Sequence, residues 1–226
     1  MKLTNLISAL VITLSALASP LLSADFLSAD ALPSPDEITI NSVKTSGSGC
    51  PRRTVTTDIS EDRTVVTLGF DEFQTYFGRR YGNSNDNRDK NCEIRLNLHY
   101  PGGFTFAVVD AVYHGFAQLD SGITGSFSSS YSFLDSRGSS EGKSCSTKST
   151  IDGGGVYENG TVYTKQDLIP TVSRVASPCG KNATLVIKTR INMSGGSANA
   201  SGTLTGDDAT IAFTQQMHIG WAVCTS

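Results

Sequence analysis

Residues 183–194 read ATLVIKTRINMS, and their side chains alternate in character with a period of two. One set of alternate positions is apolar: Leu185, Ile187, Ile191 and Met193. The other set carries long polar side chains: Lys188, Arg190 and Asn192. Because successive side chains of a β-strand point to opposite faces of the sheet, this pattern predicts a strand with one face in a core and the other in water.

The same period recurs along the chain. In residues 93–100 (EIRLNLHY) one face carries Ile94, Leu96 and Leu98. In residues 210–224 (TIAFTQQMHIGWAVC) one face carries Ile211, Phe213, Met217, Ile219, Trp221 and Val223. Helical periodicity is nearly absent, and turn-forming residues separate the runs. We therefore predict an all-β fold, an antiparallel β-sandwich of about nine or ten strands joined by disulfides.

One apolar run, residues 104–119 (FTFAVVDAVYHGFAQL), is too long for a single flat strand. Asp110 interrupts it. A β-bulge near Asp110 would let the strand change phase or pass between sheets, so we predict a bulge there.

The five cysteines are widely spaced and form no CxxC pair, which favours disulfides over a zinc site. Two bridges and one leftover thiol can be paired in several ways. We prefer Cys50–Cys92, because both cysteines stand at the head of strand-like runs. Around Cys50 the sequence SGSGCP (46–51) has glycines that permit tight turns and a proline that ends a sheet ladder, so it is predicted to be a structural corner.

The first residues divide the chain. Residues 1–18 have a lysine, then an apolar run and small residues at the end, as in a secretory signal peptide. About 13 apolar residues are fewer than the roughly 20 needed to span a bilayer. Residues 19–36 are predicted to be a flexible lead-in or pro-segment, and residues 37–226 a single domain. We expect a secreted protein with no membrane segment after signal cleavage.

The formal net charge is −3, and basic residues are spread along the chain. This distribution does not favour a nucleic-acid partner. Four N-x-S/T sequons are candidate glycosylation sites: Asn159, Asn182, Asn192 and Asn199. Because three of them fall within residues 182–199, we expect sugar at one end of the molecule.

Several short motifs occur in a consistent order: Gly47-Ser48-Gly49-Cys50-Pro51, Phe70-Asp71-x-Phe73, Lys90-Asn91-Cys92, Tyr113-x-Gly115, Ser177-Pro178-Cys179-Gly180 and Trp221-x-x-Cys224. With them the chain resembles, over residues 37–226, the secreted, mainly fungal and actinobacterial family known as domain of unknown function 4360. The resemblance implies a secreted all-β domain of undefined activity. His114 stands where the family tends to have arginine. Cys145 is not a regular family position, which implies that Cys145 is unpaired and that Cys50, Cys92, Cys179 and Cys224 form the bridges.

Candidate catalytic groups are few. A glycosidase needs two carboxylates that face each other across a cleft. Asp110 and Glu93 are the candidates, with Asp71 and Glu72 also available, but no spacing pairs any two of them. Asp110 could equally bond backbone N–H groups at the bulge. Residues 138–142 (GSSEG) match the GxSxG nucleophile motif but lie in a Ser/Gly-rich loop with no helix after it, so no serine nucleophile is predicted.

Metal and cofactor signatures are also weak. The three histidines have no short spacing such as HxH: His99, His114 and His218. Residues 83–91 (NSNDNRDKN) are rich in oxygen side chains but fail the EF-hand spacing. We predict no metal site and no cofactor.

The candidate binding residues are Tyr76, Phe77, Tyr81 and His114, and Tyr113 and Tyr131 could add to an aromatic platform if they share an exposed face. Our first hypothesis is a non-catalytic binding protein at the cell wall or in the medium, with a polysaccharide or a host or competitor protein as its partner. The alternative is a carbohydrate-active hydrolase whose carboxylates come from separate strands.

Overall fold

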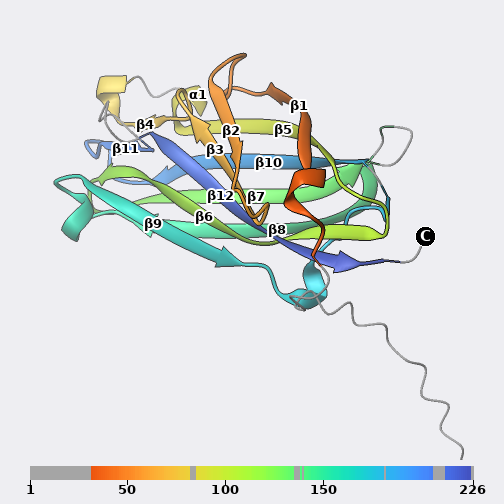
Figure 1. The fold of residues 1–226 in the computed structure, drawn as a ribbon. Helices are drawn as coiled ribbons and strands as arrows, with labels where there is room; N and C mark the ends of the chain where they lie inside the picture. The colour runs from red at the N-terminus through yellow and green to blue at the C-terminus, as the bar shows by residue number, and fades with distance from the viewer. Residues whose placement is uncertain are drawn as a thin grey trace, which may run out of the picture.

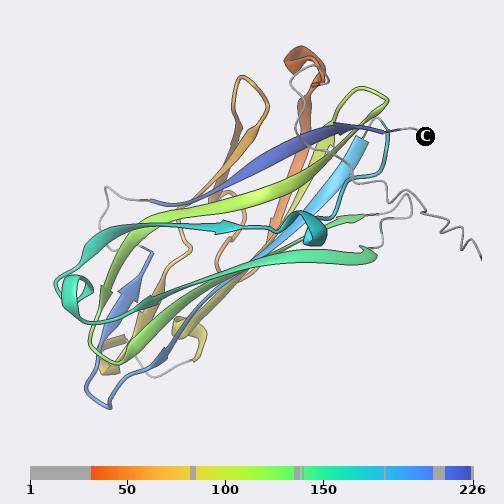
Figure 2. The ribbon, with the colours of Figure 1, turned by 90° about the horizontal axis from the view of Figure 1, so that it is seen from below.

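The computed structural model describes residues 32–81, 85–134, 138, 140–180, 182–205 and 212–224. Two antiparallel sheets stack face to face (Figures 1 and 2). The five-stranded sheet has the order β1 (Thr39–Ser46), β5 (Asp89–His99), β10 (Asn182–Gly195), β7 (Ile123–Leu134) and β8 (Ser140–Asp152). The signal peptide and most of the lead-in predicted from the sequence lie outside the described residues.

The seven-stranded sheet forms the second layer. Its order is β2 (Val55–Ile59), β3 (Val65–Phe70), β12 (Phe213–Val223), β6 (Phe104–Leu119), β11 (Gly202–Leu204) and β4 (Thr75–Phe77), and β9 (Thr161–Leu168) pairs with β6. Short helical segments lie between strands: η2 (Pro35–Glu37), η3 (Arg79–Tyr81), α1 (Asn85–Arg88), η4 (Gly155–Tyr157) and η5 (Thr171–Ser173).

The alternation seen in the sequence explains how the strands build the core. In β10 the apolar positions are buried, and Lys188 and Arg190 between them are exposed. β5 and the described part of β12 follow the same rule, except that Val223 at the end of β12 is 61% exposed; Ile211 of the predicted face lies outside the described residues. The predicted fold class, an antiparallel β-sandwich with disulfides, is confirmed.

β6 contains the predicted irregularity. Asp110 pairs with His218 of β12, but Val108 pairs with the very next residue, Ile219, so Val109 is the extra residue of a bulge. The bulge keeps Val108 and Ala111 both in the core while Asp110 points to the outer face. One strand can therefore run the length of the sandwich without losing its buried side.

Two disulfides join distant segments, Cys50–Cys92 and Cys179–Cys224, with Cα–Cα distances of 5.4 and 5.8 Å. The first is the pair preferred from the sequence. Cys145 is buried and has no disulfide. At the corner before Cys50, a Cβ on Gly49 would lie 2.1 Å from the Phe73 ring. The glycine is therefore required by close packing.

A buried polar network connects the two sheets, and the sequence analysis did not predict it. The Tyr113 hydroxyl of β6 donates to Ser129 of β7 and contacts Thr147 of β8, both at 2.8 Å. Gln215 of β12 donates to the Tyr131 hydroxyl at 3.0 Å. Burial raises the pKa of both tyrosines. Tyr113 and Tyr131 are therefore core residues, and the expectation that they could join an exposed platform is wrong.

Candidate functional site

The two ends of the sandwich differ. We call the end formed by β4, η3, α1 and β11 the pocket end, and the end formed by Tyr100, Ser177 and the second disulfide the Cys179–Cys224 end. Strand β6 runs from the Cys179–Cys224 end to the pocket end. Its first residue, Phe104, pairs with Val223 of β12, and its last residue, Leu119, pairs with Gly202 of β11. Figures 1 and 2 both show the pocket end far from the C-terminus.

At the pocket end, strand pairing places three side chains in one row. Thr203 of β11 pairs with Tyr76 of β4 on one side and with Gln118 of β6 on the other. Their neighbours Phe77 and Leu119 are buried in the core, so the row lies on the face of the sheet turned away from it. Gln118 is exposed on this face and Tyr76 is half-buried, whereas Thr203 between them is only 5% exposed. Adjacent strands are about 4.8 Å apart, which brings the three side chains within reach of one small ligand.

Tyr81 of η3 extends this row. Its ring stacks on the Tyr76 ring with centroids 4.8 Å apart and planes inclined by 28°. Beside the stack lies a pocket of about 100 Å³, lined by Tyr81, Gln118, Ser201, Gly202 and Thr203. All these side chains are neutral, so the pocket offers an aromatic ring, hydroxyls and an amide.

Phe77 does not belong to this surface. It is 5% exposed and lies in the core. The Arg88 guanidinium covers its ring at 4.2 Å. The platform expected from three neighbouring aromatic residues is therefore reduced to Tyr76 and Tyr81, because alternation along β4 turns Phe77 inward.

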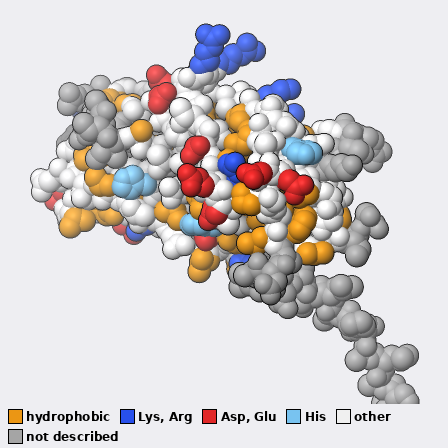
Figure 3. Space-filling model, viewed as in Figure 1, with side chains coloured by type: hydrophobic (Ala, Val, Ile, Leu, Met, Phe, Trp, Pro, Cys, Tyr) orange, Lys and Arg blue, Asp and Glu red, His pale blue; other side chains and the backbone are white. Residues whose placement is uncertain are grey.

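Asp110 has a partner that the sequence did not reveal. Its carboxylate lies 2.5 Å from Nδ1 of His218, on the outer face of the seven-stranded sheet. His114 lies on the same face and contacts Thr164 at 2.9 Å. Figure 3 shows acidic side chains near the middle of the molecule in this view and basic ones along its upper edge. Within the described residues, the Asp110 carboxylate therefore contacts a histidine side chain, and no backbone N–H donates to it.

Glu93 lies on the outer face of the other sheet. It forms ion pairs with Arg95 at 2.8 Å and with Lys188 at 3.5 Å. The hydrogen bond from Arg95 holds its pKa below the usual value. Because Asp110 and Glu93 stand on opposite sides of the sandwich, they cannot face each other across one cleft.

The remaining candidates do not form a site in the described part of the chain. The Asp89 carboxylate accepts hydrogen bonds from Arg190, and the Asp86 side chain lies outside the described residues. Ser140 of the GxSxG match begins strand β8, with its side chain outside the described residues.

Within the described ranges, no three His, Cys, Asp or Glu side chains are grouped as metal ligands need to be. No helix there is long and apolar enough to cross a membrane.

The four sequons are dispersed. Asn159, Asn182 and Asn199 are exposed, whereas Asn192 is half-buried and donates to Asp89 at 3.4 Å. Asn182 begins β10 and Asn192 lies ten residues along the same strand, a separation of about 33 Å at the rise of a strand. The expectation that three sequons share one end of the molecule is wrong.

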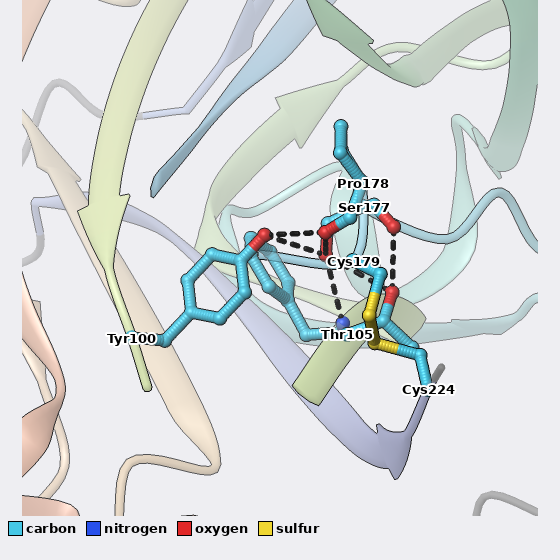
Figure 4. Close-up of a disulfide and its surroundings, with 7 residues drawn as sticks. Tyr100, Thr105, Ser177, Pro178, Cys179 and Cys224 are labelled. Atoms are coloured by element: carbon cyan, nitrogen blue, oxygen red, sulfur yellow. Dashed lines mark hydrogen bonds between the residues drawn. A yellow bond between two sulfur atoms is a disulfide. The ribbon is translucent and has the colours of Figure 1, made fainter. Parts of the chain in front are cut away.

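At the Cys179–Cys224 end, the polar side chains of Tyr100, Thr105 and Ser177 are buried. Tyr100 is fully buried, and its hydroxyl donates to the Pro178 carbonyl at 2.7 Å and contacts the Ser177 hydroxyl at 3.1 Å (Figure 4). Thr105 donates to the Ser177 carbonyl at 2.6 Å. Burial raises the pKa of Tyr100. The polar groups here bind one another beside the disulfide.

Solved structures resemble the chain only distantly. The carbohydrate-binding module TmCBM61 in complex with β-1,4-galactotriose is 10% identical, with a TM-score of 0.22 over 81% of this chain and 90% of the module. A domain of bacteriophage CBA120 tailspike protein 4 is 13% identical, with a TM-score of 0.24 over 85% of this chain and 20% of its own length. Such low TM-scores carry no information about the ligand of this protein.

Sequence relatives are closer. An uncharacterized secreted protein of Arthroderma benhamiae is 38% identical over 86% of this chain and 75% of its own length. Together with the two disulfides, this relative shows that the protein is secreted. Residues 36–224 match the family described as Domain of unknown function (DUF4360). The chain therefore belongs to the family described as Domain of unknown function (DUF4360).

Proposed function

We propose that the protein is a non-catalytic binding protein for extracellular polysaccharide, with its sugar-binding surface at the pocket end. The observation that carries this proposal is the Tyr76–Tyr81 stack beside a pocket lined by neutral residues, most of which have polar side chains. Both rings are half-buried, so each keeps some surface for a ligand.

The chemistry of this surface suits a sugar. A tyrosine ring presents an apolar face to the C–H groups of a pyranose and keeps a polar hydroxyl at its tip. The Gln118 amide and the Thr203 hydroxyl both donate and accept hydrogen bonds, and the Ser201 hydroxyl, which donates to Asp120, can still accept one; this matches the mixed character of sugar hydroxyls. A few polar groups of this kind fix the orientation of a ligand in a pocket.

The carboxylates weigh against the alternative, a hydrolase. Asp120, the acid nearest in sequence to Gln118, accepts hydrogen bonds from the Ser201 backbone at 2.7 Å and from the Ser201 hydroxyl at 3.2 Å. It thereby supports the turn that precedes β11. A glycosidase places two carboxylates roughly 5–10 Å apart, and Asp110 and Glu93 lie on opposite outer faces.

The test is a mixing experiment with insoluble chitin, β-glucan and cellulose. Depletion of protein from solution and release of reducing ends are measured in the same samples. We expect depletion with at least one polymer and no reducing ends. Tyr81→Ala and Tyr76→Ala should each weaken the apparent affinity for the polymer, as measured by depletion, at least about tenfold. This is the loss expected when one aromatic contact worth roughly 1.4 kcal/mol is removed.

The matched control is Tyr157→Ala, which removes another half-buried tyrosine that lies outside the row. It should leave depletion unchanged. Release of reducing ends would favour the hydrolase instead. Equal losses from Tyr81→Ala and Tyr157→Ala in folded proteins would show that the Tyr76–Tyr81 stack is not the sugar-binding surface.

A further inference from the structure

A second pocket lies next to the tyrosine stack. It has a volume of about 260 Å³ and is lined by Phe77, Arg79, Arg88, Gly195, Gly196 and Ser197 among others. Arg79 begins η3 and Tyr81 ends it, so the two pockets are separated by one short helical turn. A ligand that covers Tyr81 can therefore reach the second pocket as well.

The charged side chains that line this pocket in the described part of the chain are basic, although the chain as a whole is acidic. Two of its lining side chains are arginines, and none of the described lining residues is acidic. Arg79 is exposed and forms no ion pair with any residue in the described parts of the chain. By contrast, Arg95 and Arg190 on the five-stranded sheet each contact a carboxylate.

The shape of the pocket depends on glycines. Gly195 and Gly196 have φ angles of 82° and 79°, which other residues rarely adopt. A Cβ on Gly195 would lie 2.4 Å from the Gly122 carbonyl oxygen, and one on Gly196 would lie 3.0 Å from the Phe77 ring. The two glycines are therefore required by their backbone conformation and by close packing against Gly122 and Phe77, and they add no side chain to this wall of the pocket.

We infer that this pocket binds an anionic group of the polysaccharide, a carboxylate or a sulfate on the sugar adjoining the one at Tyr81. The inference rests on the proposed function and names its ligand class, an acidic polysaccharide. A guanidinium presents a planar set of donors that matches the oxygens of carboxylate and sulfate groups. Ser197 at the rim adds a hydroxyl that donates or accepts.

The experiment compares polymers that differ only in charge. Binding of the full protein to polygalacturonate is measured against the same polymer with its carboxylates methyl-esterified, and binding to dextran sulfate is measured against dextran. We expect at least one acidic polymer to bind about tenfold more tightly than its neutral counterpart, and the preference to shrink as salt increases. The arm that shows the preference identifies the anion.

The test variant is Arg79→Gln, and the matched control is Arg52→Gln, another exposed arginine far from the pocket in sequence. Arg79→Gln should abolish the preference for the acidic polymer while leaving binding to the neutral one unchanged. Arg52→Gln should leave the preference intact. Equal affinities for acidic and neutral polymers, or equal effects of the two variants, would overturn the inference.

The outcome separates this inference from the proposed function. If Tyr81→Ala weakens binding to all polymers and no acidic preference exists, the sugar-binding surface stands and the anion pocket does not. If the acidic preference depends on Arg79 but Tyr81→Ala changes nothing, the anion pocket stands and the tyrosine surface does not. If no polymer binds, both are wrong.

Discussion

The two ends of the sandwich use the same residue types for different purposes. At the Cys179–Cys224 end, Tyr100 is fully buried, and its hydroxyl, Ser177 and Thr105 bind one another. At the pocket end, Tyr76 and Tyr81 stack half-buried beside two pockets. The comparison teaches that tyrosines and hydroxyls indicate a ligand surface only where the surrounding chain leaves them open to solvent.

The largest effect should come from removing a disulfide. Each bridge closes a loop of similar length, with sequence separations of 42 and 45. The double variants Cys50→Ser/Cys92→Ser and Cys179→Ser/Cys224→Ser should therefore each lower the free energy of unfolding by about 4 kcal/mol. Chemical denaturation measures both losses.

The same two variants test whether the ends are independent. At a temperature where the protein remains folded, loss of the Cys179–Cys224 bridge should leave polysaccharide affinity unchanged. A large loss of affinity on removal of this distant bridge would contradict the idea that the Cys179–Cys224 end contributes stability and the pocket end binds the ligand. Loss of the Cys50–Cys92 bridge acts closer to the pocket end, because Cys92 follows Arg88 by four residues.

The next largest effect should come from Tyr100→Phe. This change removes the hydroxyl that binds Ser177 and the Pro178 carbonyl and leaves buried acceptors without their donor. We expect a loss of about 1–3 kcal/mol in the free energy of unfolding. Tyr157→Phe, at a half-buried tyrosine, should cost almost nothing, and an equally small loss for Tyr100→Phe would show that the hydroxyl of Tyr100 contributes no stability through the network around Ser177.

The long strands could be predicted well from the sequence because the apolar residues at alternate positions are also the buried ones. Strand β8 was missed, since only a few of its inward residues, such as Cys145 and Ile151, are apolar and the rest of the strand is rich in serine, threonine and lysine. β4 and β11 have three residues each, which is too short for a period of two to be recognised.

The candidate site was predicted only in part. Tyr76 and Tyr81 were expected to share a surface because they are close in sequence, but Thr203 and Gln118 join them only through the pairing of β11 with β4 and β6. The Asp110–His218 contact likewise joins residues 108 apart in the chain. Strand register decides both contacts, and composition alone does not reveal register.

A smaller effect on stability should follow from Tyr81→Ala. The stack on Tyr76 is half exposed, so its loss should cost about 0.5–1.5 kcal/mol in the free energy of unfolding. Thermal or chemical denaturation of this variant beside Tyr100→Phe gives the comparison directly. A cost above that of Tyr100→Phe would mean that the pocket end is as tightly packed as the other end.

The smallest change should be seen at the one cysteine that has no disulfide, Cys145, whose thiol should not react while the protein is folded. Cys145 lies on β8 and its thiol is buried, which raises its pKa. Since the thiolate is the reactive form, a raised pKa together with burial leaves little thiolate in the folded protein at pH 8. Incubation of the folded protein with a thiol-alkylating reagent should therefore give no mass increase over hours, whereas addition of denaturant should give one adduct per chain. Rapid labelling of the folded protein would show that β8, the edge strand of the five-stranded sheet, opens readily and exposes the Cys145 thiol.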